Sequence, residues 1–393
     1  MRIGVDATCW SNRRGYGRFA RDLLTALLKL DTPHRFTLFV DAQTAARGDF
    51  PTDCEIVIAP TSEAPTQAAS ATGHRTLSDT FKMSRAVRQR PPDILLFPSV
   101  YTYFPVTTRT KMILGVHDVI AEDHPRLVFP QWRNRFLWRL KSRLARLQAH
   151  AVMTVSDFAK RGITRHFRLE PATVFVVEEA PDPVFRPLPD DALDRELLAA
   201  HGVREGDRFI VYLGGVNPHK NLAALVRVLG SLRQEPSFSD VSALIVGDTE
   251  GDVFTPGHPT LKRTVEELGL SRAVRFTGFL PDEAVVSILC AAKALVLPSL
   301  AEGFGLPAVE AAACGTPVVA TVNSPLPDLL AGGGFFVDPN DEGAMADALR
   351  LLLSDEGRRR ALGAAARDRA VKLTWERSAR QALAMLETVG QGH

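Results

Sequence analysis

Cysteine and net charge are both scarce in this sequence, and each scarcity excludes a class of protein. The 393 residues include four cysteines, at Cys9, Cys54, Cys290 and Cys314, which are far apart and form no CxxC pair. A zinc knuckle, a thioredoxin-type site and a disulfide-stapled scaffold are therefore not expected, and isolated thiols fit a reducing compartment. Forty-seven Lys and Arg against 45 Asp and Glu leave a net charge of +2, too small for a general nucleic-acid binder.

Long apolar runs and a leader segment are lacking as well. No apolar run approaches the roughly 18 residues that a membrane-spanning helix needs. The first ten residues, MRIGVDATCW, predict a strand and contain no basic segment followed by an apolar one, so no secretory signal is expected. These absences predict a cytoplasmic protein that does not cross a membrane.

What the sequence does contain is an alternation of short apolar runs with helical patterns, typical of parallel α/β sheets. At about 150 residues per domain, the length predicts two domains. The runs lack polar alternation, as strands covered on both faces do. The expected strands are Arg2–Thr8, Phe36–Val40, Glu55–Ile58, Ile94–Phe97, Met112–Val116, Val152–Val155, Val174–Val177, Phe209–Leu213, Ser242–Val246, Val274–Phe276, Ala294–Leu297, Pro317–Ala320 and Phe335–Val337.

A proline-rich segment, Glu178–Pro189, separates the two sets of strands. Its four prolines cannot continue a helix or join a central strand. We therefore predict two doubly wound, Rossmann-like domains at 1–182 and 183–374. Because ligands of such sheets bind at the carboxyl ends of the strands, two facing sheets predict an interdomain cleft. Pro60–Asp79, rich in Ser, Thr, Ala and Pro, is expected to be a surface loop.

A glycine-rich turn near the N-terminus, Gly15-Tyr-Gly17-Arg18-Phe-Ala20, matches the dinucleotide fingerprint GxGxxA, and Asp41 closes the next strand where an NAD-ribose carboxylate belongs. The spacing argues against NAD, because the first glycine of that fingerprint should follow the strand directly. What remains is a turn at a helix N-terminus that suits a phosphate or a sugar hydroxyl. NAD binding and a purely structural turn stay open as alternatives.

Two further motifs follow strands directly. His117-Asp118 stands at the end of a central strand, where a polar pair normally faces a ligand; a core histidine and a capping aspartate are the alternatives. Gly214-Gly215-Val-Asn-Pro-His219-Lys220 places a lysine at a helix start, which suits a diphosphate. That turn lacks the P-loop pattern, and a plain strand–helix turn explains it equally well.

The most specific stretch is Pro298–Glu310, with two carboxylates, Glu302 and Glu310, eight residues apart. The first stands in a glycine turn and the second about one turn into the next helix. The turn presents N–H groups to whatever Glu302 faces, so the pair suits the hydroxyl groups of a sugar and a ribose. A capped helix start alone would not explain a glutamate in so tight a turn.

These motifs together resemble the family-4 retaining glycosyltransferases, over nearly the whole chain from residue 2 to about residue 385. Within that family, the runs GYGRF, HDV and NPHKN most resemble bacterial polysaccharide mannosyltransferases. The resemblance implies a GT-B fold, with the N-terminal domain binding the acceptor and the C-terminal domain binding the nucleotide-sugar. It also implies that 375–393, which begins Trp375-Glu-Arg, is a closing helix that packs back toward the N-terminal domain. The motifs that carry it are Gly15–Arg18, His117-Asp118, Ser156–Lys160, Gly214–Lys220 and Glu302 with Glu310.

The same resemblance implies roles for individual residues. Lys220 should neutralise the donor diphosphate, Glu302 should hold the sugar hydroxyls, and Glu310 should hold the ribose. His117 should contact the sugar ring from the N-terminal domain. The other residues expected around the donor are Gly15, Gly17, Arg18, Gly214, Gly215, His219, Gly278, Phe279, Leu280, Gly303, Phe304, Gly305 and Leu306, with the base lying against Thr277–Leu280.

One departure concerns the diphosphate. Many family members carry an Arg just before or several residues ahead of the lysine, where this chain has His219 and Gly215. His219, Arg18 or helix N-termini must then neutralise part of the negative charge on the departing diphosphate. No Asp-x-Asp triplet occurs, so a metal clamp has no evident ligands, and the family resemblance likewise implies metal independence and no cofactor.

The expected function is transfer of a hexose, first of all mannose from GDP-mannose, to a glycan or lipid-linked acceptor with retention of configuration. In this family a donor phosphate oxygen is thought to take the acceptor proton. A UDP-sugar donor is the nearest alternative. An NAD-dependent oxidoreductase and a non-catalytic sugar-nucleotide or glycan-binding module remain as alternatives from other classes.

A helical stretch at 131–150 groups Trp132, Phe136, Leu140, Leu144 and Leu147 on one face. A stripe of arginines lies beside them, at Arg135, Arg139, Arg143 and Arg146. The favoured interpretation is an ordinary helix that packs this apolar face on the first sheet. The alternative is a peripheral contact with anionic lipid on the inner face of the membrane or with a lipid-diphosphate acceptor.

Overall fold

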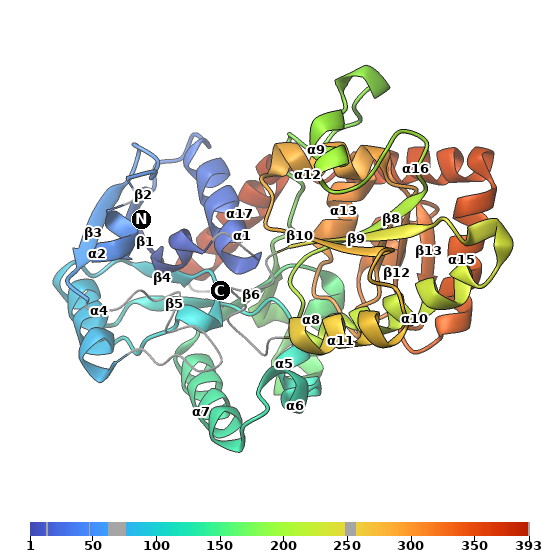
Figure 1. Ribbon diagram of the computed structural model, residues 1–393. Coiled ribbons are helices and arrows are strands. Elements are labelled where there is room, and N and C mark those ends of the chain that lie inside the picture. Colours follow the sequence, from blue (N-terminus) through green and yellow to red (C-terminus); the bar gives the residue numbers. More distant parts are fainter. Residues whose placement is uncertain (13–14, 47, 62–75, 248–256, 392–393) are drawn as a thin grey trace. The chain divides into compact units, whose positions relative to one another are not determined.

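The computed structural model describes residues 1–12, 15–46, 48–61, 76–247 and 257–391 (Figure 1). The chain divides into two compact units. Unit 1 comprises residues 1–179 and 375–393, and unit 2 comprises residues 180–374. The division falls after Glu179, whereas the sequence predicted it after residue 182. Of the loop predicted at Pro60–Asp79, residues 62–75 lie outside the described residues, and Leu77–Asp79 are helical instead.

The sheet of unit 1 has seven parallel strands in the described part of the chain, in the order β3-β2-β1-β4-β5-β6-β7. These strands are β1 (Arg2–Asp6), β2 (Arg35–Asp41), β3 (Glu55–Ala59), β4 (Ile94–Phe97), β5 (Lys111–Gly115), β6 (Ala151–Thr154) and β7 (Val174–Val176). The helices are α1 (Gly15–Leu28), α2 (Ala42–Ala45), α4 (Leu77–Gln89), α5 (Ile120–Asp123), α6 (Pro125–Val128), α7 (Trp132–Gln148), α8 (Asp157–Phe167) and α17 (Trp375–Gln391), with 3-10 turns at Thr8–Ser11, Val100–Thr102 and Pro171–Thr173.

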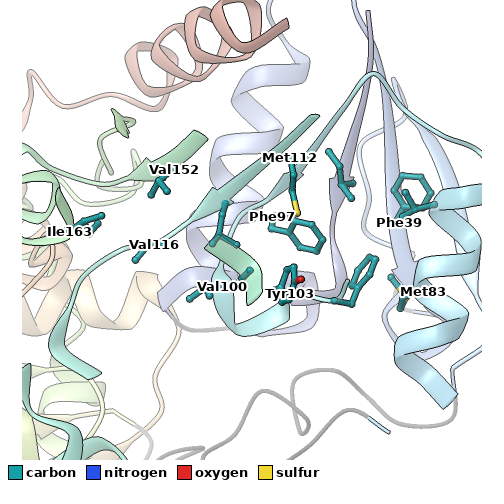
Figure 2. Close-up of a cluster of buried hydrophobic side chains, with 14 of the residues drawn as sticks. Phe39, Met83, Phe97, Val100, Tyr103, Met112, Val116, Val152 and Ile163 are labelled. Carbon is teal, nitrogen blue, oxygen red and sulfur yellow. The ribbon is translucent and has the colours of Figure 1, made fainter. Parts of the chain in front are cut away.

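The core of unit 1 fills the space between this sheet and the helices beside it. Figure 2 shows Met83 of α4 beside Phe39 of β2, and Ile163 of α8 beside Val152 of β6, and all four residues are buried. On another side, α1 packs against α17, and α17 also contacts β4. The C-terminal helix therefore belongs to unit 1 although its sequence follows unit 2.

The sheet of unit 2 has six parallel strands within the described ranges, in the order β10-β9-β8-β11-β12-β13. These strands are β8 (Phe209–Leu213), β9 (Ser242–Val246), β10 (Val274–Gly278), β11 (Ala294–Leu297), β12 (Val318–Thr321) and β13 (Gly334–Val337). The helices are α9 (Arg195–Ala200), α10 (Leu222–Arg233), α11 (His258–Glu267), α12 (Asp282–Ala291), α13 (Leu306–Ala313), α14 (Leu326–Leu329), α15 (Glu342–Ser354) and α16 (Glu356–Ala370), with 3-10 turns at Asp190–Ala192, Pro218–Lys220 and Pro236–Phe238.

The predicted fold class, two doubly wound parallel α/β domains, is confirmed, and each expected strand is present to within two residues at either end. In each sheet the strand order reverses once, between β1 and β4 in unit 1 and between β8 and β11 in unit 2. Such switch points leave a crevice at the carboxyl ends of the strands, where ligands bind. The motifs that follow β8 and β11 are therefore brought side by side.

The predicted packing of the helix at 131–150 is wrong. The helix is present as α7, but its buried residues are Ser142 and Ala145. Phe136 and Leu147, from the face predicted to be buried, are 60% and 72% exposed. The helical period establishes which residues share a face, but not which face the domain covers. α7 is therefore attached to unit 1 by its other side.

Candidate functional site

The central feature of unit 2 is a contact between the two residues that the sequence singled out. Lys220 ends the 3-10 turn after β8, and Glu302 lies in the turn after β11. The Nζ atom of Lys220 donates to Oε1 of Glu302 at 2.7 Å. Because β8 and β11 are neighbours at the switch point, the strand order itself places this pair at the carboxyl edge of the sheet.

Backbone and side-chain hydrogen bonds hold the two turns together. The N–H of Leu300 donates to the carbonyl of His219 at 2.9 Å, which joins the Lys220 turn to the Glu302 turn. Asn221 adopts a left-handed conformation, with φ of 56°, and its Nδ2 donates to the carbonyls of Pro298 and Pro339. The Lys220 turn is thereby fixed between the ends of β11 and β13.

The carboxylate of Glu302 lies in a nearly closed environment. The residue is 7% exposed, and its Oε1 also accepts from the hydroxyl of Ser299 at 2.6 Å. Its backbone N–H donates to the carbonyl of Asn323 at 3.0 Å. Ser299 lies within the Pro298–Glu310 stretch, but the sequence analysis gave it no role. The signal that could have identified it is a hydroxyl residue three positions before the glutamate of the turn.

The glycine turn after Glu302 depends on Gly305. This residue has φ of 88°, and a Cβ added there would lie 2.8 Å from Cδ1 of Leu326, so a side chain would be strained and crowded. Gly305 immediately precedes Leu306, the first residue of α13. Phe304 as a whole residue is 3% exposed.

The other donor residues predicted in unit 2 surround this edge of the sheet. Glu310 lies on α13 and is 2% exposed. Gly215 accepts from the hydroxyl of Tyr212 through its carbonyl at 2.7 Å. Gly278 ends β10 and forms a bridge with Gly247. The ring of Phe279, in the segment predicted to meet the base, is 52% exposed.

In unit 1, His117 follows β5 as predicted, but both of its ring nitrogens are engaged within the unit. Nε2 lies 2.9 Å from the carbonyl of Pro98, and Nδ1 lies 3.6 Å from Oε1 of Glu179. The ring also packs edge-on against Phe19, with 4.8 Å between centroids. Burial lowers the pKa of His117, but the hydrogen bond and charge of Glu179, together with the Pro98 carbonyl and the charge of Asp118, outweigh it, so the net pKa is raised. His117 is thereby stabilised as an imidazolium.

Glu179 was missed by the sequence analysis as a partner of His117. It lies in the proline-rich segment used only to mark the boundary, and it is the last residue of the first of the two segments that make up unit 1. Its neighbour Glu178 pairs with Arg377 of α17 at 2.8 Å. Two consecutive residues, Glu178 and Glu179, therefore contact α17 and His117, respectively.

Asp118 and Asp41 have structural roles. Oδ1 of Asp118 accepts from the N–H of Ile120, the first residue of α5, at 2.8 Å. Oδ1 of Asp41 accepts from the N–H groups of Gln43 and Thr44 at the start of α2. A 3-10 turn at Thr8–Ser11 also separates β1 from the glycine turn. Both observations weigh against the NAD alternative.

The glycine turn itself opens α1, which begins at Gly15. A Cβ at Gly17 would lie 2.3 Å from the carbonyl oxygen of Asn12, so only glycine allows this close approach of two backbone segments. Arg18 pairs with Asp22 across one helical turn at 3.6 Å. Gly15, Gly17, Arg18 and His117 thus belong to unit 1, and every other predicted site residue belongs to unit 2.

The described part of the chain contains no group of three or more His, Cys, Asp or Glu that could hold a metal ion. All four cysteines are free thiols. Within the same ranges, no helix combines the length and apolarity needed to cross a bilayer.

Two family profiles match most of the chain. The profile described as "Glycosyltransferase Family 4" matches residues 13–183, and the one described as "Glycosyl transferases group 1" matches residues 194–369. The two matches fall on the N-terminal part of unit 1 and on unit 2. The residues predicted to bind the donor after β8, β10 and β11 all lie within the second match.

Curated relatives agree with these profiles. A D-inositol 3-phosphate glycosyltransferase of Corynebacterium jeikeium is 36% identical over 200 residues, covering 50% of this chain and 46% of the relative. An MMP alpha-(1->4)-mannosyltransferase of Mycolicibacterium hassiacum is 31% identical over 288 residues, covering 70% and 65%. An O-antigen chain mannosyltransferase B of Escherichia coli is 30% identical over 244 residues, covering 60% of each. The chain spans about half the length of the first curated relatives that it matches.

Solved structures share the fold. A sucrose-phosphate synthase from Thermosynechococcus elongatus superimposes with a TM-score of 0.77 at 18% identity, covering 100% of both chains. HepE from Anabaena, solved in complex with UDP-glucose, gives a TM-score of 0.73 at 17% identity, covering 99% of both chains. At such identities the likeness establishes the GT-B type of fold and no more.

Proposed function

Because the chain belongs to the glycosyltransferases of group 1 and family 4, we propose that it transfers a hexose from a nucleoside diphosphate sugar to a glycan or lipid-linked acceptor, with retention of configuration. Mannose from GDP-mannose is the proposed donor. Two relatives that share about 30% identity with the chain are named mannosyltransferases, which supports this choice. A UDP-hexose is the alternative donor, since no residue described above selects the base.

The observation that carries this proposal is the contact of Lys220 with Glu302 at the switch point of unit 2. Cleavage of a sugar–phosphate bond develops negative charge on the departing diphosphate, and a fixed ammonium group stabilises that charge. Glu302 beside it can accept hydrogen bonds from sugar hydroxyls. A cation and a carboxylate thus lie at adjacent positions, which supports a site where the cation would bind the phosphates and the carboxylate would bind the sugar.

Other residues complete the proposed donor site. Glu310 would accept from the ribose, the backbone amides around Gly305 would donate to the sugar, and the exposed ring of Phe279 would lie against the base. His219, next to Lys220, would meet part of the diphosphate charge in place of the arginine that many family members carry. These fixed donors would supply the stabilisation that a divalent cation gives elsewhere, so we propose catalysis without a metal or a cofactor.

For His117 we propose a role other than direct contact with the sugar ring. In the free protein its two ring nitrogens face Pro98 and Glu179, so the side chain would have to exchange one of these partners to hydrogen-bond a sugar. Its raised pKa, however, favours the imidazolium form, which would place positive charge at the carboxyl end of β5. We propose that this charge, rather than a neutral hydrogen-bond acceptor, is what His117 offers to a bound donor.

A thermal-shift panel tests the proposed donor. The full chain is heated with GDP-mannose, UDP-glucose, UDP-N-acetylglucosamine, GDP, UDP and NAD, first without added metal and then with EDTA. A ligand at about 100 times its dissociation constant adds about 2.7 kcal/mol of stability, a shift of a few degrees for a chain of this size. Stabilisation by GDP-mannose and GDP, unchanged by EDTA, is the expected result.

The other outcomes separate the alternatives. Stabilisation by a UDP-sugar and UDP would reassign the donor and leave the reaction class intact. Stabilisation by NAD alone would overturn the proposal. Binding of a nucleotide-sugar without turnover toward any tested glycan or lipid-linked acceptor would favour a non-catalytic binding module.

A further inference from the structure

α7, labelled in Figure 1, carries several large apolar side chains that are exposed. These side chains are between 41% and 72% exposed, the highest value being that of Leu147. They are Trp132, Phe136, Leu137, Leu140, Leu144 and Leu147. Scattered exposed apolar residues are normal, but six on one helix form a contiguous patch that marks an interaction surface.

The opposite side of α7 is firmly attached to unit 1 by aromatic and polar contacts. The ring of Trp138 stacks on Tyr101 with 4.8 Å between centroids, and its Nε1 donates to Glu122 at 2.9 Å. Nζ of Lys141 donates to the carbonyl of Tyr101 at 2.7 Å. Oε1 of Gln148 accepts from the hydroxyl of Tyr103 at 2.8 Å. These contacts fix the rotation of α7 about its own axis. The apolar side chains named above are therefore exposed because the helix is held in this orientation.

The charge on α7 is of one sign. Its 17 residues include six basic residues and no acidic one. Arg135 and Arg146 contact the unit, the first donating to the carbonyl of Phe129 and the second lying over the ring of Phe167. Arg133, Arg139 and Arg143 are exposed instead. At 100° per residue these three fall among and beside the exposed apolar side chains.

We propose that this outer face of α7, formed by the six apolar side chains with Arg133, Arg139 and Arg143, binds the surface of a bilayer that contains anionic lipids. Apolar side chains interleaved with arginines match the boundary between acyl chains and negatively charged headgroups. A second copy is a poorer occupant. A two-fold contact through this face would bring the same arginines of both copies together, with no acidic residue on α7 to neutralise them.

Vesicle co-sedimentation of the full chain tests the proposal without any donor or acceptor, so its outcome does not depend on the proposed reaction. The probes are phosphatidylcholine vesicles with and without phosphatidylglycerol. The protein is expected to pellet with the anionic vesicles and to remain in solution with the neutral ones. Binding should weaken as salt is raised, because the arginine contribution is screened.

Variants of the exposed side chains separate the two contributions without disturbing the core. Phe136→Ser should weaken partitioning about tenfold, as loss of one inserted aromatic ring predicts. Arg139→Gln and Arg143→Gln should each weaken it about fivefold. Phe81 on α4 is the matched control, since it is an exposed phenylalanine of the same unit, 61% exposed against 60% for Phe136. Phe81→Ser should bind vesicles like the wild type.

Three outcomes would overturn the proposal. The first is absence of wild-type binding to anionic vesicles at low salt. The second is binding that the α7 substitutions and the Phe81→Ser control affect equally. The third is that the wild-type protein does not bind vesicles, forms a dimer in light scattering, and becomes a monomer when Phe136 is replaced by Ser. That result would identify the face as an interface between copies.

Discussion

The ammonium group of Lys220 and the carboxylate of Glu302 pair at 2.7 Å, and the same carboxylate oxygen accepts from Ser299 at 2.6 Å. Two groups proposed to bind opposite halves of one donor therefore neutralise each other in the free protein. In the proposed reaction, a donor phosphate would add negative charge next to Lys220 and would compete with Glu302 for it. Glu302 would then be released to accept from sugar hydroxyls. The pair would keep both charges satisfied until the donor arrived.

Substitution of Glu302 by Gln should separate nucleotide binding from sugar binding. Lys220 loses the negative charge of its partner and becomes more available, so GDP should stabilise the variant at least as much as it stabilises the wild type. The additional stabilisation that GDP-mannose gives over GDP should fall, because an amide is a weaker acceptor than a carboxylate. Thermal shifts with GDP and with GDP-mannose measure the two effects on the same protein.

The control for that substitution is Glu266→Gln, on the exposed side of α11, which should change neither shift. Equal loss of GDP and GDP-mannose stabilisation in Glu302→Gln would contradict the division of roles. It would show that Glu302 supports the turn as a whole.

Substitution of Lys220 by Ala should lower turnover by a factor of about 100 or more, the typical loss when one fixed donor to a developing negative charge is removed. It also leaves the nearly buried Glu302 carboxylate without its cation, which should cost about 1–3 kcal/mol of unfolding free energy. Steady-state kinetics with the identified donor and urea unfolding measure the two losses. Lys262→Ala, an exposed lysine of α11, is the matched control. Turnover of Lys220→Ala close to that of the wild type would refute the diphosphate role.

Much of this architecture could be predicted because it depends on local patterns. Apolar runs such as Phe209–Leu213 establish buried strands, and the motifs after β8 and β11 stand out as polar residues where strands end. Their contact could not be predicted from spacing, since Lys220 and Glu302 are far apart in the chain and meet through the strand order. The attachment of α7 was predicted wrongly because Trp138 and Gln148, whose contacts orient the helix, find partners only in the folded unit. Glu179 was overlooked because its partner, His117, is distant in sequence.

The pairing of His117 with Glu179 predicts a pH dependence of stability. The pKa of His117 is raised in the folded protein, so the folded state binds this proton more tightly than the unfolded state does. The resulting stability is fully present below the ordinary histidine pKa and is lost as the pH rises through the folded value. Glu179→Gln should therefore destabilise the protein at about pH 6 and change little at about pH 9. Urea unfolding across this range measures the difference.

The neighbouring residue supplies the control. Glu178→Gln weakens a pair with Arg377, and arginine stays charged throughout this range. Its destabilisation should therefore be the same at both pH values. If Glu179→Gln gave an equally flat profile, the imidazolium assignment for His117 would be wrong.

Glu122 predicts a second pH effect, with a separate cause. Burial raises the pKa of this carboxyl to about 7, although the Trp138 indole that donates to it favours the charged form. The folded state thus holds a proton that the unfolded chain releases near the ordinary glutamate value. Stability is lost as the pH rises from that value through about 7. Glu122→Gln keeps an oxygen for Trp138 but has no proton to lose, so its stability relative to the wild type should increase between about pH 5 and pH 8. Exposed Glu170 provides the matched Glu→Gln control, which should show no such trend. A constant difference between Glu122→Gln and the wild type would mean that Glu122 titrates normally and that burial beneath α7 leaves its proton affinity unchanged.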